Sequence, residues 1–137
     1  MRLAALRIFL AATTLSATLL PFARAAAGGD AIAFTAPQAA IGAKTYAKNC
    51  ASCHGANLGG VTAPALVGRT SAIAQQSLAE VYEYISQQMP MTAPGTLSKA
   101  QYLSILAYIL QKNGHKAGSR PLSASVASTD TATIQKP

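Results

Sequence analysis

The sequence predicts an all-α domain with three main helices, on three observations. Three segments begin with residues typical of helix caps, apolar residues recur at helical spacing within the segments, and no run alternates as a half-buried strand would. The 137 residues have room for one domain. The composition of the two ends places that domain at residues 33–118.

The first helix is expected from Gln38 to Asn49. Residues 35–38, Thr-Ala-Pro-Gln, have the form of a capping box with a proline in the first turn. The apolar stripe of this helix is narrow and includes Ile41 and Tyr46.

The second helix is expected from Leu78 to Gln88, after a second capping box that runs from Ser77 to Glu80. Its apolar face, with the spacing i, i+3, i+4 and i+7, consists of Leu78, Val81, Tyr82 and Ile85. Pro90 ends the helix, because the residue before a proline is driven out of the helical conformation. Glu80 and Glu83 are expected to face solvent.

The third helix follows a third capping box, from Ser98 to Gln101, and stops at Asn113-Gly114. Its broad apolar face consists of Tyr102, Leu103, Leu106, Ile109 and Leu110. Between the first two helices, residues 55–68 form a loop punctuated by glycine and proline.

Residues 1–25 have the organisation of a secretory signal peptide. Arg2 and Arg7 precede an apolar stretch from Ile8 to Leu20, and Ala23-Arg24-Ala25 is an A-x-A cleavage site. The alternative, a retained membrane anchor, is disfavoured because the stretch is shorter than the ~20 residues that span a bilayer. We therefore expect a protein exported to the periplasm, with no membrane span after cleavage.

Residues 119–137 are rich in Ser, Thr and Ala and contain few large apolar side chains. This composition predicts either a surface tail or a strap along the domain. The remaining domain is small, and domains of this size often need a disulfide, a metal or a large cofactor for stability.

The pentapeptide Cys50-Ala51-Ser52-Cys53-His54 is a C-x-x-C-H motif, which is typical of covalent haem attachment. Two vinyl groups on one edge of the porphyrin must each meet a thiol, and two intervening residues bring both sulfur atoms to that edge. The next residue, His54, then lies under the iron as the proximal ligand. The sequence therefore predicts one covalent haem c, bound through Cys50 and Cys53, whose iron is ligated by His54.

Three other uses of these cysteines are possible. A thioredoxin-like dithiol would require neighbouring strands, which the sequence does not predict. A zinc site needs four ligands, and the next histidine, His115, is distant in sequence. A disulfide between residues so close together would close too small a loop to stabilise the chain much.

Further residues carry a resemblance to a known family. Gly42, Tyr46 and Cys50 are spaced four residues apart, Tyr108 lies in the last helix, and residues 63–68 contain Pro64 in a P-x-L-x-G pattern. Across residues 35–115 the sequence resembles the class I cytochrome c family. The resemblance implies the cytochrome c fold, with helices and loops around one haem, and with Gly42 and Tyr46 meeting Tyr108. It also implies that the Pro64 carbonyl accepts a hydrogen bond from His54.

The sixth iron ligand is expected to be Met89. A thioether is a neutral, soft ligand that raises the reduction potential relative to a second histidine. By resemblance to the family, whose axial methionine commonly precedes a proline ahead of the last helix, Met89 before Pro90 is the candidate. Met91 and His115 are alternative candidates for this ligand. If it is not a ligand, Met91 is expected to fill a gap in the core, and His115 to lie in a surface loop.

The charge argues for a protein partner. The chain carries a net charge of +7, and loss of the three arginines of the signal peptide leaves +4. Basic residues form no run interleaved with aromatics, so nucleic-acid binding is not expected. A mildly basic face suits an acidic partner surface.

No nucleophile–base arrangement is visible, so the predicted function is that of an electron-transfer protein rather than an enzyme. Residues 89–98 resemble those of periplasmic cytochromes that accept electrons from quinoprotein dehydrogenases and pass them toward a terminal oxidase or another cytochrome. The free protein is expected to be a monomer. A cytochrome subunit held permanently in a dehydrogenase, and a haem-based sensor or peroxidase-like protein with an open sixth site, remain alternatives.

Overall fold

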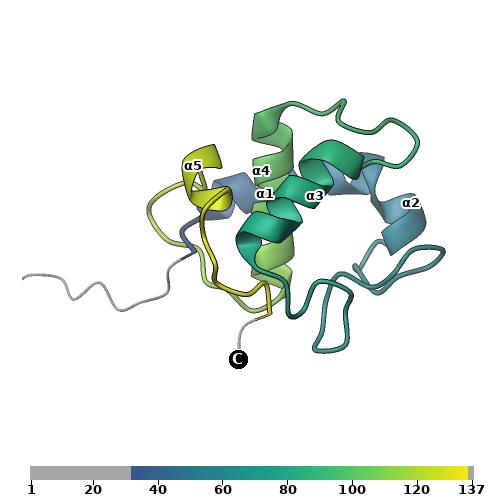
Figure 1. The fold of residues 1–137 in the computed structure, drawn as a ribbon, viewed down its shortest axis with the longest axis horizontal. Coiled ribbons are helices and arrows are strands. Elements are labelled where there is room, and N and C mark those ends of the chain that lie inside the picture. The colour runs from purple at the N-terminus through teal and green to yellow at the C-terminus, as the bar shows by residue number, and fades with distance from the viewer. Residues whose placement is uncertain (1–31, 136–137) are drawn as a thin grey trace, which may run out of the picture.

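Helices dominate the part of the chain that the computed structural model describes, residues 32–135; the predicted signal peptide lies outside it. The helices are α1 (Ala36–Asn49), α2 (Ala51–His54), α3 (Leu78–Gln88), α4 (Lys99–Lys112) and α5 (Ala124–Ala127). Figure 1 shows α3 crossing in front of α4, with α2 and its following loop to one side. The all-α prediction with three main helices is therefore confirmed. None of the helices within residues 32–135 has the length and apolar character needed to cross a membrane.

The start of α1 differs from the predicted capping box. The Thr35 hydroxyl does accept a hydrogen bond from the Gln38 amide nitrogen, at 3.3 Å. The Gln38 side chain, however, pairs with the backbone of Leu122: Nε2 donates to the Leu122 carbonyl at 2.9 Å, and Oε1 accepts from the Leu122 nitrogen at 2.8 Å. Because this pairing satisfies both ends of the amide, only half of the capping box forms.

The apolar stripe of α1 is also displaced from the prediction. The buried residues are Ala39, Gly42 and Tyr46, whereas Ile41 is 57% exposed. The buried face is the one that packs against α4. Gly42 permits this contact because it has no side chain to separate the two backbones.

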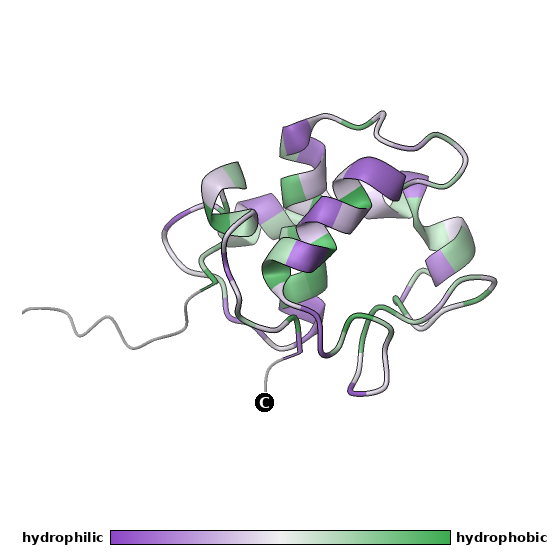
Figure 2. Ribbon diagram, viewed as in Figure 1, coloured by the Kyte–Doolittle hydropathy of each residue, from purple (hydrophilic) through white to green (hydrophobic). Residues whose placement is uncertain are grey.

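Both remaining capping boxes form as predicted, at Ser77 and at Ser98. On α3, Leu78 and Val81 are buried, while Glu80 and Glu83 face solvent. All five predicted apolar residues of α4 are buried. In Figure 2 hydrophobic colour accordingly marks the turns of α4 that α3 crosses.

Residues 122–135 form a strap across the start of α3. Leu122, Ala127 and Ile134 are buried in the common core. The nitrogen of Leu78 donates to Ala132, and the nitrogen of Ile134 donates to Gln76. The composition of this segment predicted either a surface tail or a strap along the domain, and in the structure residues 122–135 form a strap.

Candidate functional site

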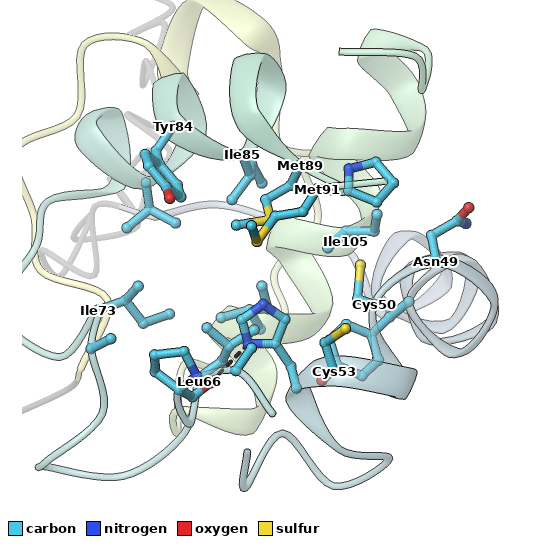
Figure 3. Close-up of a pocket in the computed structure, with 18 of the residues that line it drawn as sticks. Asn49, Cys50, Cys53, Leu66, Ile73, Tyr84, Ile85, Met89, Met91 and Ile105 are labelled. Atoms are coloured by element: carbon cyan, nitrogen blue, oxygen red, sulfur yellow. Dashed lines mark hydrogen bonds between the residues drawn. The ribbon is translucent and has the colours of Figure 1, made fainter. Parts of the chain in front are cut away.

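An apolar cavity of about 530 Å³ lies between α2, α3 and α4. Its walls include side chains from every helix except α5, together with the loops that follow α2 and α3. This volume is in the range of about 300–1,000 Å³ that is usual for cofactor sites. Figure 3 shows the labelled side chains of Cys50, Cys53, Met89 and Met91 around this cavity.

Cys50 and Cys53 occupy the junction of α1 and α2. The nitrogen of Cys50 donates to the Tyr46 carbonyl, which ends α1, and the nitrogen of His54 donates to the Cys50 carbonyl, at 2.9 Å, within the next turn. Both cysteines are free thiols that border the cavity. The structure therefore contains no disulfide bond between Cys50 and Cys53.

Burial raises the pKa of the Cys50 thiol to about 11, and the neighbouring Cys53 adds to this shift. A dithiol oxidoreductase works through a thiolate whose pKa is lowered. The environment of Cys50 has the opposite effect, which argues against the thioredoxin-like interpretation.

The His54 ring is oriented by the Pro64 carbonyl, which lies 2.8 Å from Nδ1. A carbonyl can only accept, so Nδ1 carries the hydrogen and donates it. The other nitrogen, Nε2, then keeps its lone pair for a metal. The expected contact between Pro64 and His54 is confirmed, and it has the form of the partner hydrogen bonds that orient metal-binding histidines.

The loop that carries Pro64 is fastened at both ends. The Cys53 carbonyl accepts hydrogen bonds from the nitrogens of residues 61–63, at 3.0–3.1 Å. At the other end, Asn113 Nδ2 donates to the Leu66 carbonyl at 2.9 Å, and Asn113 Oδ1 accepts from the Gly68 nitrogen at 3.3 Å. Asn113 was expected only to end the third helix. Asn113 is only 4% exposed, and its side-chain amide holds the loop that carries Pro64. The local sequence pattern does not reveal this role.

The two helices of the predicted crossing meet as expected. The rings of Tyr46 and Tyr108 lie 5.4 Å apart between centroids, tilted by 54°. The Tyr46 hydroxyl donates to the Gly55 carbonyl at 2.8 Å, which ties α1 to the residue after His54. This crossing therefore holds the cysteine and histidine segment against the cavity.

Met89 and Met91 border the same cavity from the segment that follows α3. Met89 caps the end of α3 and is half-buried, whereas Met91 is 77% exposed. In Figure 3 both side chains point into the cavity, across from Leu66. The structure thus places both candidate thioethers, and not one alone, at the site.

His115 lies away from the cavity. Its Nε2 is 2.9 Å from the Ile134 carbonyl, beside the strap. Within residues 32–135 no group of three or more His, Cys, Asp or Glu side chains could hold a metal ion, as a zinc site would require. The donors at the cavity are instead two thiols, one imidazole and the thioethers. In an apolar cavity of this volume, that donor set fits a covalently attached haem.

Comparison with known proteins agrees with this geometry. The family described as cytochrome c oxidase, cbb3-type, subunit III, matches residues 37–109, more than half of the chain. No curated protein sequence matches the chain. Among solved structures, a chain of the sulfane dehydrogenase SoxCD from Paracoccus pantotrophus is similar, with 29% identity and a TM-score of 0.50. The similarity covers 73% of this chain but 58% of that one, which is less than two thirds of its length.

Proposed function

Because the chain belongs to the family of cbb3-type cytochrome c oxidase subunit III and is a class I c-type cytochrome, we propose that it is a monohaem electron carrier of the bacterial periplasm. Membership of a cytochrome c family implies haem c, whose iron supplies one-electron chemistry by alternating between the ferric and ferrous states. The observation that most supports the proposal is the set of thiols, imidazole and thioethers on the walls of one apolar cavity.

Each residue at the site has a distinct task in this proposal. Cys50 and Cys53 would bind the haem covalently, as thioethers. His54 would ligate the iron through Nε2, while its Nδ1 hydrogen bond to Pro64 keeps the ring in one tautomer and one orientation. Met89 would supply the sixth ligand, and the apolar side chains would exclude water.

The optical spectrum of the exported protein tests the proposal. After expression with a cytochrome-maturation system, the protein should show the reduced and oxidised bands of a low-spin c-type haem, and its mass should exceed that of the polypeptide by one haem. Replacing both Cys50 and Cys53 with alanine should abolish the covalent haem. A colourless wild-type protein with the mass of the polypeptide alone would overturn the proposal.

Export forms a separate part of the proposal, supported by the sequence of residues 1–25. The protein should be recovered from the periplasmic fraction, with a mass that corresponds to cleavage after Ala25. An intact N-terminus in the membrane fraction would mean that this segment is retained as an anchor.

The similarity to a chain of SoxCD favours a second candidate: a cytochrome bound permanently to a dehydrogenase. In that case the protein would co-purify with a large redox enzyme at native expression levels. A free carrier would instead elute as a monomer in size-exclusion chromatography of the same extract.

A further inference from the structure

Tyr102 joins the two ends of the segment that carries both methionines. Its hydroxyl donates to the Met89 carbonyl at 2.6 Å and accepts from the Leu97 nitrogen at 3.4 Å. The hydroxyl therefore uses both its donor and its acceptor capacity to close residues 89–97 into a loop. Only 3% of the Tyr102 surface is exposed, so water does not compete well for these bonds.

Tyr102 is itself held by a rigid element. It lies in the first turns of α4, and its backbone nitrogen donates to the Ser98 carbonyl at 3.1 Å. The Met89 carbonyl also accepts from the Gly95 nitrogen, at 3.3 Å. The backbone of Met89 is thus attached both to its own loop and to the helix that forms the core of the protein.

Met91 has no equivalent attachment. Within residues 32–135 no hydrogen bond holds its backbone, and its side chain is the more exposed of the two. Yet Met91 borders the same cavity and offers the same chemical group. Because the two thioethers are chemically alike and two residues apart, a preference between them must come from how each backbone is held.

We propose that Tyr102 is a positioning residue that selects Met89 over Met91 as the thioether ligand. The inference rests on the proposed function, in which a methionine is the sixth ligand. Loss of the hydroxyl would release the Met89 carbonyl from α4, while the aromatic ring would still fill its place in the cavity wall. Met91 would then compete for the same position.

The Tyr102→Phe variant of the haem-loaded, reduced protein tests this inference. With ¹³C-methyl-labelled methionine, the methyl group on the iron-bound sulfur has a strongly displaced NMR signal, and the Met89→Leu and Met91→Leu proteins assign it. In wild type the Met89 signal should be the main one. Tyr102→Phe should raise the ratio of the Met91 form to the Met89 form by about two- to tenfold over wild type, as expected for the loss of one hydrogen bond.

Tyr82→Phe is the matched control. Like Tyr102→Phe, it removes one tyrosine hydroxyl, in this case from a half-buried side chain. Within residues 32–135 the tyrosine hydroxyls that form hydrogen bonds are those of Tyr46 and Tyr102. Tyr82→Phe should keep the wild-type ratio of the two signals, and the double variant Tyr102→Phe with Met91→Leu should lose the Met91 signal. Circular dichroism of each variant establishes that the fold is retained.

The possible failures differ. If Tyr102→Phe, correctly folded, keeps the wild-type ratio of the two signals, the role of Tyr102 is overturned and the proposed function stands. If Met91 gives the main signal in wild type, or neither methionine gives a displaced signal, both this inference and the assignment of Met89 are overturned.

Discussion

Gly42 of α1 lies directly against the backbone carbonyl of Ser104 in α4. A side chain placed on Gly42 would overlap that carbonyl and would also touch the nitrogen of Ile105. The two helices thus approach as closely as their backbones allow. The same crossing brings Tyr46 to Tyr108, and through the Tyr46 hydroxyl it fixes the segment that contains His54.

The Gly42→Ala protein should therefore be markedly destabilised. The obstacle to the new methyl group is backbone rather than a movable side chain, so α1 and α4 would have to separate. We expect the free energy of unfolding to fall by about 1–3 kcal/mol or more, measured by urea unfolding of the haem-loaded protein. Gly118→Ala is the control, because no heavy atom lies near its added methyl group. Equal stability of the two variants would contradict the close approach.

Tyr46 makes the stability of the protein depend on alkaline pH. Burial, with contributions from Cys50 and Tyr108, raises the pKa of Tyr46 from 10.0 to about 12. The unfolded chain therefore loses this proton first, and stability should fall as the pH rises from about 10 to about 12.

The Tyr46→Phe protein should lack this part of the alkaline loss of stability, although it is less stable at neutral pH by about 1 kcal/mol for the hydrogen bond to Gly55. Urea unfolding across the pH range measures both effects. Tyr84→Phe, at an exposed position, should keep the wild-type profile. If the free energy of unfolding of Tyr46→Phe and of wild type fell equally with pH above about 10, the raised pKa of the Tyr46 hydroxyl would be contradicted.

Glu80 gives α3 a dependence on acidic pH. Hydrogen bonds from the Ser77 backbone nitrogen and hydroxyl, each 2.7 Å, lower the pKa of this carboxyl group. A carboxylate with a lowered pKa stabilises the folded state above its unfolded pKa, and this contribution is lost as the pH falls through the folded value.

The Glu80→Gln protein should therefore be less stable than wild type at neutral pH, and the difference should vanish on acidification. Thermal unfolding at a series of pH values tests this. Glu83→Gln on the exposed side of the same helix serves as the control, since its carboxyl group forms no capping box. If the stability difference between wild type and Glu80→Gln grew as the pH fell, the lowered pKa of Glu80 would be contradicted.

The strap should contribute substantially to stability. Ile134 is fully buried, so Ile134→Ala should lower the free energy of unfolding by about 2–5 kcal/mol. Val126 on α5 is 37% exposed and serves as the control position in the same strap. Val126→Ala should change the free energy of unfolding by no more than about 1 kcal/mol. Denaturant unfolding of both variants measures these changes. If the strap does not contribute to the core, both substitutions should lower the free energy of unfolding only slightly.

Much of the architecture was predictable because its signals are local. The capping boxes at Ser77 and Ser98 link residues three positions apart, so the sequence displays both partners together. The same holds for the C-x-x-C-H motif, whose cysteines and histidine are brought to one cavity by a single helical turn. Resemblance to a family then indicated the Gly42 crossing and the hydrogen bond from His54 to Pro64.

Misjudged features involve partners that are distant in sequence. Gln38 was expected to complete a local cap, but it pairs with Leu122, 84 residues away. Tyr102 and Asn113 occupy the roles predicted for them, as a buried residue of α4 and the end of that helix, but each also bonds backbone groups of a loop, which the sequence did not indicate.

By itself, the sequence determined where the three main helices end, where α3 and α4 begin, and which residues carry thiol, imidazole and thioether groups. The tertiary structure alone decided which face of α1 is buried, how residues 122–135 cover α3, and which polar side chains hold the loops around the cavity. The physical reason is that a cap depends on neighbours within one turn. A side chain that bonds the backbone of a distant loop finds its partner only after the helices have packed and excluded water from both.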